Sequence, residues 1–407
     1  MKRLGIAICI VATFAIVGGF AGFCWIISRS LQTQTLAQLR AEIPTDLQPY
    51  KVINPAAQSR YRGLLELAKS VEPTDVDGWV WFSKDPKQRR QQALVRRKYA
   101  PAFAKLDALL GAGPLQVAPH TSSDHPPKEL ATLCGALADA ESDAVLCQDG
   151  ADARHLERLF LSLAQELRKS KGSLTDQWYA WTAEWEALTG YLGAEHASLL
   201  NNADRKELLD RLPPDDGVDP ELADALKRGL TELTVPRLYA TAHPGLGSRP
   251  HRGRFDVRET VRLHAQLYKE AVRDALSRSP RPWEGAYTLQ QEAYKRSMSA
   301  YKGQASFQGR LMQGFTGNAY GDWLLAYCPV SQYLVRSREQ ATFRNMVRAI
   351  MLARHGPAPT LPDPLGYGNL QFNLRRRWVW SVGLNGIDEK GRYGPPGSYA
   401  GDFSLRY

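Results

Sequence analysis

The chain has 407 residues, of which 43% are hydrophobic, and a formal net charge of +10 at pH 7. This hydrophobic content is ample for a packed core, and the length fits one large domain or two smaller ones. Because the basic residues are dispersed among 42 acidic ones, the charge indicates a solvated basic surface that attracts anionic lipid or envelope polymer, with no nucleic-acid partner.

An uncharged stretch near the start of the chain predicts a membrane anchor. Residues 4–27 contain no charged side chain, and as a helix they would reach about 36 Å, enough to cross a hydrocarbon core of about 30 Å. Lys2 and Arg3 precede the stretch and Arg29 follows it, which favours a cytoplasmic N-terminus. We therefore predict a single-pass protein of the bacterial inner membrane whose C-terminal bulk is periplasmic or otherwise extracytoplasmic.

A cleaved signal peptide is the alternative interpretation of this stretch. The apolar region of such a peptide usually has about 7–15 residues, and no clean A-x-A cleavage site follows here, so the anchor is favoured. Gly18 and Gly22 form a small-xxx-small pair suited to self-association of two anchors. Glycine is also common in membrane helices without any such role, so both interpretations of the pair stay open.

Beyond the anchor, the spacing of apolar residues predicts a mainly α protein built from antiparallel helical hairpins, similar to tetratricopeptide repeats. The expected division is a cytoplasmic tip and anchor (1–28), a polar stalk (29–53), a helical extracytoplasmic domain (54–356) and a small β tail packed on it (357–407). Helices are expected to begin at Asn54-Pro55 and Asp85-Pro86 and to lie near 128–147, 151–169, 174–193, 204–212, 220–233, 256–278, 284–300 and 331–354.

Two of these helices are expected to begin with the same pair of residues, an N-cap followed by proline. Asn54 and Asp85 can cap free N–H groups, and the proline after each fits the first helical position. In the second of the two helices, Pro101 is expected to introduce a kink or to end the first half. Its predicted buried stripe is Leu94, Phe103, Leu106 and Leu110.

Three tryptophans share one face of the helix predicted at 174–193, namely Trp178, Trp181 and Trp185. They suit a carbohydrate platform, but the spacing continues into leucines, so packing between helices is favoured. Residues 237–254 lack periodicity and are expected to form a mobile basic loop. It could grip an anionic ligand, but a plain disordered excursion is the favoured alternative. Arg249, His251, Arg252 and Arg254 are its candidate partner-binding residues. His264, on the apolar face of a later helix, is expected to be a hydrogen-bonded core residue.

The last residues change character and predict a small antiparallel sheet, with strands at Leu370–Leu374, Arg377–Val382 and Phe403–Tyr407. Between the last two strands, Asn385, Asp388, Glu389 and Asp402 could supply oxygen ligands to calcium, which takes about six to eight of them. The favoured alternative is an Asn-Gly turn that presents acids to water. We therefore expect no metal and no cofactor.

The rest of the sequence offers few residues or motifs that indicate a disulfide or a catalytic site. Cys134 and Cys147 would lie about 20 Å apart on one helix, too far for a disulfide. The sequence holds no G-x-S-x-G, no H-E-x-x-H and no phosphate-binding Gly-rich loop with Lys-Ser/Thr, which favours a non-catalytic protein.

The C-terminal segment WVWSVGLNGIDEKGRYG…GDFSL resembles the "YSVGpNGxDdgG…D" tail of an uncharacterised family of bacterial single-pass envelope proteins. It is also similar to the C-terminal loop of the type II secretion major pseudopilin, where similar acids hold calcium. LPDPLGYGNLQF at 361–372 is similar to the segment that precedes the tail in the same family. The sequence departs from that pattern at Glu389-Lys390, which puts a bound cation in doubt. The resemblance implies a helical body with a small β tail and carries no known reaction.

Two functions remain after these observations. The favoured one is a membrane-anchored envelope interaction or scaffold protein with an unidentified envelope protein as partner, because stacked helical hairpins offer extended binding surfaces. The alternative is a hydrolase or binding protein that acts on an envelope polymer.

Overall fold

The fold was obtained as a computed structural model, which confirms a mainly helical protein with one small antiparallel sheet. It describes residues 35–49, 54–72, 85–117, 128–242, 255–278, 284–303, 318–353, 359–366, 368–373, 375, 378–383, 388, 390 and 403–406. None of the helices in these ranges is long and apolar enough to cross a membrane, and the uncharged stretch 4–27 lies outside them.

The chain separates into two compact units. The first is drawn from Met1–Gln48, Leu230–Glu270 and Gly285–Pro329, and the second from Pro49–Gly229, Ala271–Glu284 and Val330–Tyr407. Each unit is therefore assembled from segments that are distant in sequence. The predicted division of the chain at residues 28, 53 and 356 stays a prediction.

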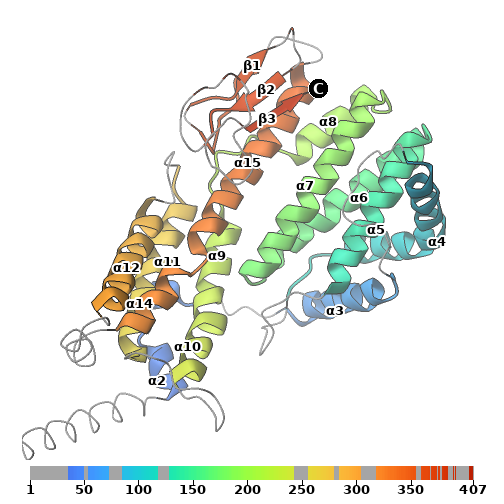
Figure 1. Cartoon of the computed structure of the whole chain (residues 1–407). Coiled ribbons are helices and arrows are strands. Elements are labelled where there is room, and N and C mark those ends of the chain that lie inside the picture. Colours follow the sequence, from blue (N-terminus) through green and yellow to red (C-terminus); the bar gives the residue numbers. More distant parts are fainter. Residues whose placement is uncertain are drawn as a thin grey trace, which may run out of the picture. The chain divides into compact units, whose positions relative to one another are not determined.

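The second unit contains a row of antiparallel helices in which α4, α5, α6 and α7 pack against one another in sequence order (Figure 1). Their apolar stripes form one core with the middle of α15, centred on Leu133, Phe160, Leu188 and Phe343. The bounds are α3 (Pro55–Lys69), α4 (Pro86–Gly111), α5 (Lys128–Leu146), α6 (Gly150–Lys169), α7 (Leu174–His196), α8 (Asn202–Arg211), α9 (Pro220–Arg228) and α15 (Val330–Ala353).

The predicted helix starts are confirmed. The Asn54 side chain accepts from Ala57 N at 3.1 Å, and the Asp85 side chain accepts from Lys87 N at 2.9 Å, each with proline at the next position. Both contacts satisfy backbone donors that a helix leaves unpaired in its first turn.

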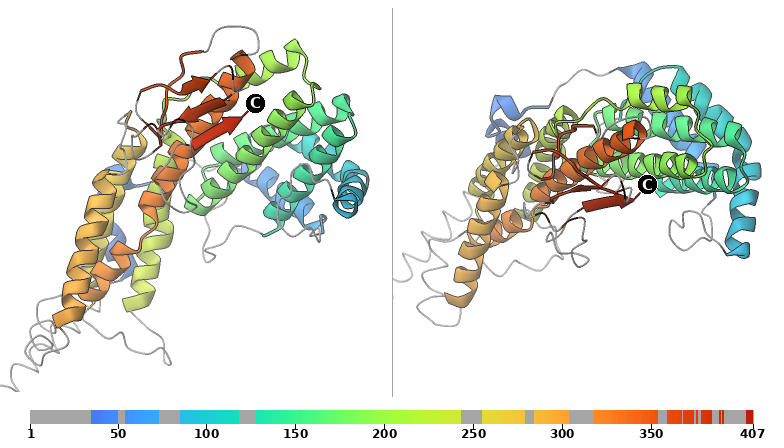
Figure 2. Two further views of the ribbon diagram at one scale, coloured as in Figure 1. Left: turned by 45° about the horizontal axis from the view of Figure 1, so that its top comes forward. Right: turned by 90° about the horizontal axis from the view of Figure 1, so that it is seen from above.

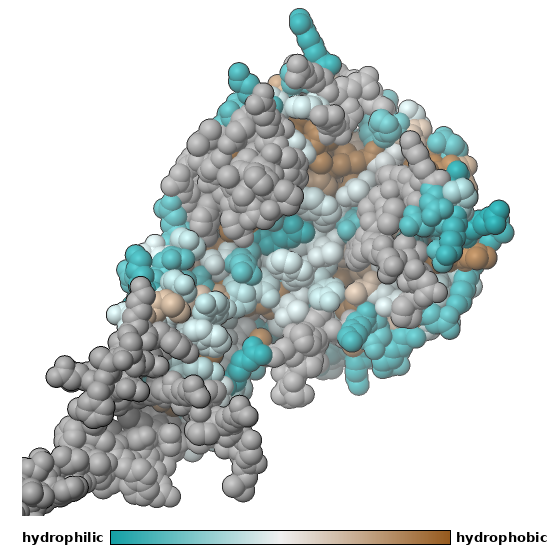
Figure 3. Space-filling view, in the orientation of Figure 1, coloured by the Kyte–Doolittle hydropathy of each residue, from teal (hydrophilic) through white to brown (hydrophobic). Residues whose placement is uncertain are grey.

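The predicted details of α4 need one correction. The helix continues through Pro101, so of the two predicted effects of this proline the end of the helix does not occur. Leu94, predicted to be buried, is 65% exposed. A step of four residues back from Phe103 leads to Tyr99, and a second step of four leads to Val95, and both residues are buried. Leu94 is one residue from Val95 and so points about 100° away from that face. Basic side chains dominate the exposed surface of α4, and Figure 3 shows hydrophilic residues over much of this side of the molecule.

The first unit is built around helices that come from the middle of the chain. It contains α2 (Leu36–Ala41), η1 (Thr45–Leu47), α10 (Val235–Ala242), α14 (Ala319–Ala326), most of α11 (Val257–Ala275) and nearly all of α12 (Glu284–Gly303). Its second segment begins within the π-helical turn η2 (Gly229–Thr234). Residues 237–242 are thus helical, which corrects the start of the predicted basic loop. Its end at 243–254 lies outside the described residues.

His264 is the buried core histidine that the sequence predicts. Its Nδ1 donates to the Thr260 carbonyl at 2.9 Å, and the residue is 3% exposed. Burial lowers the pKa of His264 to about 4, partly offset by this hydrogen bond, so the ring is neutral at physiological pH.

The predicted sheet is confirmed with shorter strands. β1 (Gln371–Asn373), β2 (Trp378–Ser381) and β3 (Phe403–Arg406) pair antiparallel in that order. Val379 of β2 packs with Met346 and Ile350 of α15, and the views of Figure 2 show the sheet beside this helix. The Asp363 carboxylate joins the preceding loop to the sheet, because it accepts from Gly366 N at 3.0 Å and from Val382 N at 3.2 Å.

One helix crossing in the second unit depends on a glycine. Glu141 of α5 is fully buried, and its carboxyl group lies against Gly190 of α7. A Cβ atom at position 190 would stand only 1.6 Å from Glu141 Oε1, so a larger residue fits only if the buried Glu141 side chain is displaced from its place in the core.

We predict that Gly190→Ala lowers the free energy of unfolding by about 2 kcal/mol, because the added methyl group overpacks this crossing. Gly135 is the matched control, because it is also helical and a Cβ atom there would meet nothing within 4 Å. Gly135→Ala should leave stability unchanged or raise it by up to about 1 kcal/mol. Denaturant titration of both variants measures the difference, and equal stabilities would contradict the packing described here.

Candidate functional site

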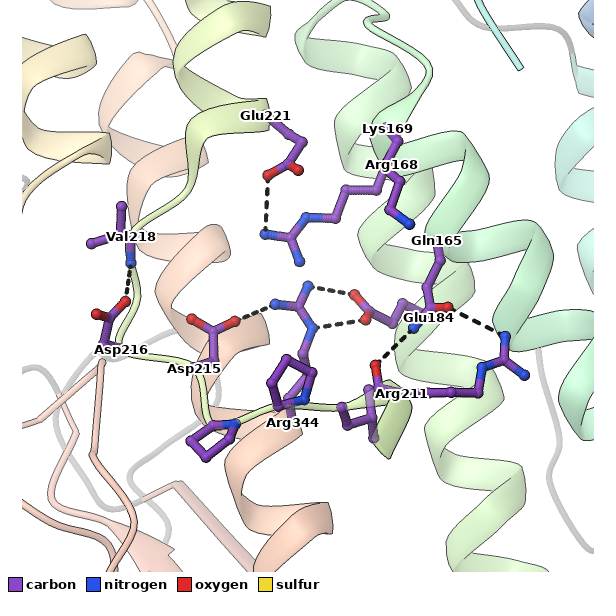
Figure 4. A pocket seen from close by; sticks show the side chains of 13 residues that line it. Gln165, Arg168, Lys169, Glu184, Arg211, Asp215, Asp216, Val218, Glu221 and Arg344 are labelled. Atoms are coloured by element: carbon purple, nitrogen blue, oxygen red, sulfur yellow. Dashed lines mark hydrogen bonds and ion pairs between the residues drawn. The ribbon is translucent and has the colours of Figure 1, made fainter. Parts of the chain in front are cut away.

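A pocket of about 550 Å³ lies in the second unit among α6, α7, α8, α9, α15 and the segment that joins α8 to α9. Most of its lining side chains are charged (Figure 4). The joining segment is the sequence PPDDG, residues 213–217, in which Gly217 adopts φ of 81°. Such a backbone conformation favours glycine, and it lets the segment turn toward α15.

The centre of the pocket is a buried ion pair between Arg344 of α15 and Glu184 of α7. Arg344 Nε lies 2.7 Å from Glu184 Oε1, and Arg344 Nη2 lies 2.6 Å from Glu184 Oε2. The two side chains are 7% and 3% exposed. Arg344 Nη1 also donates to Asp215. One guanidinium thus joins two helices and the α8–α9 segment through bidentate geometry that only arginine provides.

The ionisation of this pair follows from its surroundings. Burial alone would raise the pKa of Glu184, but the charge and hydrogen bonds of Arg344, with Arg168 and Gln340, more than offset that effect and hold the pKa below its usual value. The acids around Arg344 likewise outweigh its burial and raise its pKa. Both groups stay charged across the physiological pH range.

A further residue of α15 fixes the α8–α9 segment. Asn345 Oδ1 accepts from Asp215 N at 2.9 Å, and Asn345 Nδ2 donates to the carbonyls of Asp215 at 2.6 Å and Pro362 at 2.9 Å. Next to it, Arg348 Nη1 donates to the Leu209 and Leu212 carbonyls, both at 2.6 Å. One face of α15 therefore sets the position of the pocket wall.

Acidic and basic side chains of the pocket lie on opposite sides of it. Asp215 and Asp216 stand on the left of Figure 4, on the α8–α9 segment, while Lys169 and Arg211 stand on the right. Arg211 Nη2 donates to Ser162 Oγ at 2.8 Å, and Lys169 is exposed. The pocket thus offers an acidic wall and a basic wall across the central ion pair.

Arg168 is the link between α6 and the start of α9. Its Nη2 lies 3.3 Å from Asp219 Oδ1 and 3.9 Å from Glu221 Oε2. Asp219 also accepts from Ser337 Oγ at 2.5 Å and caps α9 through Leu222 N at 2.9 Å. Burial opposes the charge of Asp219, but Arg168 and these hydrogen bonds hold its pKa below the usual value.

This arrangement is suited to binding. A general acid or base works best with a pKa near the operating pH, whereas Glu184 and Asp219 are held ionised. Glu184 lines the pocket, and its fixed charge needs no reorganisation when a ligand with groups of both signs enters. A polypeptide segment with acidic and basic side chains, or a chain end, has that chemistry.

A second cluster of acids lies in the core, away from solvent. Glu141 of α5 and Glu157 of α6 are both 0% exposed, and within the described chain none of their four carboxyl oxygens has a hydrogen-bond partner. Burial raises the pKa of Glu157 to about 8, helped by the charge of Asp204. Burial, with the charges of Glu157 and Glu186, raises the pKa of Glu141. Because no substrate reaches these groups, we assign them to the core.

Most of the predicted site residues lie outside the described residues: Asn385, Glu389 and Asp402, and the basic residues Arg249, His251, Arg252 and Arg254. Asp388 is described, and its Oδ1 accepts from Trp380 Nε1 at 3.0 Å and from Lys390 N at 2.8 Å. This carboxylate thus takes part in a turn after β2. The calcium hypothesis stays untested.

The tryptophan face of α7 packs between helices, as favoured from the sequence. Trp181 is 0% exposed, and Trp185 stacks on Phe343 with a centroid distance of 3.9 Å. Arg336 covers the Trp185 ring at 5.0 Å. Only Trp178, 42% exposed, has a large solvent-facing surface.

Sequence reasoning missed the pocket. The acidic turn PPDDG was its one visible signal, while Glu184 and Arg344 are single charges inside helices 160 residues apart. Comparison with protein-family models, with curated proteins and with solved structures gave no match.

We predict that Arg344→Met lowers the free energy of unfolding by about 3–5 kcal/mol, because it leaves Glu184 charged and buried without its partner. Adding Glu184→Met should recover most of this loss. The control is Arg278→Met, which removes an exposed pair with Asp216 at 2.8 Å and should cost less than about 1 kcal/mol. Denaturant unfolding measures all three variants; a double variant as unstable as Arg344→Met would contradict the account.

The buried acid Glu157 predicts a loss of stability at raised pH. Its folded pKa, about 8, lies above the ordinary 4.5, so the folded chain holds a proton that the unfolded chain releases. The stabilisation is complete below the lower value and is lost as pH rises through the higher one, by up to about 1.4 kcal/mol per pH unit. Glu157→Gln should flatten this slope, and Asp107→Asn, exposed on α4, should leave it unchanged. Unfolding free energies measured across this window would refute the prediction if Glu157→Gln kept the wild-type slope.

Proposed function

We propose that this protein is a non-catalytic, membrane-anchored interaction or scaffold protein of the bacterial envelope, and that its pocket binds a charged polypeptide segment of a partner. The observation that carries the proposal is the pocket itself, with an acidic and a basic wall on either side of the Arg344–Glu184 pair. Such a distribution recognises alternating charges without any chemical step.

The proposed binding surface is organised before a partner arrives. An ion pair holds Arg168 in place, and hydrogen bonds hold Arg211 and Asp215, so little side-chain freedom is lost on binding. Lys169 is the exposed member of the basic wall, and it is therefore the position at which a partner's carboxylate would be met first.

The anchor belongs to the same proposal. Residues 4–27 would hold the protein in the inner membrane as a single-pass protein, with the N-terminus in the cytoplasm and the folded units outside. The sequence of residues 1–29 supports this topology through its uncharged stretch and its flanking basic residues. The resemblance of the C-terminal segment to the family of single-pass envelope proteins is compatible with it and stays a prediction.

Site-specific photo-cross-linking tests the proposed partner. Benzoylphenylalanine placed at Lys169 should give a discrete polypeptide adduct in intact cells, while the same group at Lys105, exposed on α4 and outside the pocket, should not. Reversing the charge with Lys169→Glu should weaken recovery of that partner by about tenfold, the effect of a lost contact of about 1.4 kcal/mol. Equal adducts at both positions would contradict the proposal, and adducts of glycan alone at position 169 would favour the envelope-polymer alternative.

A further inference from the structure

Five aromatic rings form a continuous row on the first unit. Phe255 meets Tyr320 edge-on at 5.5 Å, and Tyr320 stacks on Trp323 at 5.7 Å. Trp323 meets Tyr327 at 5.1 Å, and Tyr327 meets Tyr294 of α12 at 6.5 Å. We call these five residues the aromatic row. It follows α14 and ends on α12.

Three residues of the aromatic row are exposed to solvent, and each is a tyrosine or a tryptophan. Trp323 is 37%, Tyr294 41% and Tyr327 58% exposed, and Tyr287, also on α12, is 51% exposed. In the described part of the first unit, each exposed large hydrophobic side chain is thus a tyrosine or a tryptophan. These side chains have an apolar body and a polar tip, which suits the boundary between hydrocarbon and water.

The helices that carry the row are tied together. Arg296 of α12 lies 2.9 Å from Asp322 of α14, and Asn318 Nδ2 donates to Thr260 Oγ1 of α11 at 2.8 Å. A Cβ atom on Gly321 would stand 2.1 Å from that Thr260 oxygen, so α14 and α11 are in close contact there. The row is therefore a fixed surface.

The segment that follows the uncharged stretch is bound to the same unit. Leu39, Ile43 and Leu47 of this segment are at most 4% exposed. Glu42 accepts hydrogen bonds from Arg258 and from Arg262, the latter at 3.2 Å from Nη2. Arg258 and Arg262 belong to the first turns of α11, three and seven residues after Phe255 of the aromatic row.

Chain length limits how far this end of the unit can lie from the end of the anchor. Residues 28–34 connect the uncharged stretch to Thr35, the N-cap of α2. Even fully extended, these residues span only about 25 Å. The contacts of Glu42 with Arg258 and Arg262 lie at the N-terminal end of α11, and so does Phe255, the first residue of the aromatic row. The short connection therefore keeps the aromatic row close to the bilayer that the anchor would enter.

We propose that the aromatic row, with Tyr287, lies in the headgroup region of the bilayer that residues 4–27 enter. This inference rests on the membrane anchoring proposed above. Lys295, exposed beside Tyr294, adds attraction to anionic headgroups. The consequence is that the first unit contacts the membrane surface directly and is not held away from it on a free stalk.

Fluorescence quenching in vesicles tests the contact. The full chain is reconstituted into phosphatidylcholine vesicles that contain phosphatidylglycerol, with or without bromine atoms near the carbonyl end of the acyl chains. The emission of Trp323 is taken as the difference between the wild type and Trp323→Phe. Trp178→Phe supplies the matched control, because Trp178 is 42% exposed but belongs to the second unit.

Brominated lipid should remove at least about half of the Trp323 emission, because a tryptophan at the interface lies within contact of the upper acyl chain. The Trp178 emission should be little changed. Equal emission of Trp323 in both kinds of vesicle, with quenching by acrylamide in water, would overturn the inference. Flotation of the same samples separates the two proposals: a chain that floats without Trp323 quenching refutes only the contact, whereas a chain that does not float refutes the anchor.

Discussion

The packing of α15 in the second unit depends on the buried cation of Arg344. The guanidinium of Arg344 binds Glu184 through two hydrogen bonds and Asp215 through a third, and it thereby ties α15 to α7 and to the α8–α9 segment. A buried charge is tolerated only when its partners replace the water it has lost. Asn345 and Arg348 of the same helix add to this link, since they bind backbone groups of Asp215, Leu209 and Leu212 at the α8–α9 wall of the pocket.

The second unit buries some acidic side chains beside arginines and others without a partner in the described chain, and the two surroundings shift the pKa in opposite directions. Glu184 and Asp219 are paired with arginines and stay ionised, because those charges lower the pKa of each acid below its usual value. Glu141 and Glu157 have no partner in the described chain, and burial raises the pKa of each. They are retained as neutral acids at the crossing of α5, α6 and α7, where Gly190 leaves room for one of them.

Local features of the fold could be predicted from the sequence, and long-range ones could not. Asn54 and Asp85 cap their helices through atoms two or three residues away, so a short window contains the whole interaction. The strands β1 to β3 were visible from alternation. Arg344 and Glu184, by contrast, lie in mid-helix and resemble ordinary surface charges until the fold joins them. α14 was not among the predicted helices, and its Gly321 serves close packing against Thr260, a contact made only in the folded chain.

Hydrogen exchange on the full chain tests most directly whether this buried cation unites the pocket walls. Peptides that cover α7, the α8–α9 segment and α15 should exchange through one opening with a common free energy, because their polar contacts form and break together. The segment of residues 213–218 should then be protected at Asp215, whose amide is bound by Asn345. A segment that exchanges at a much lower free energy than α7 and α15 would contradict the account, because the pocket wall would then open on its own.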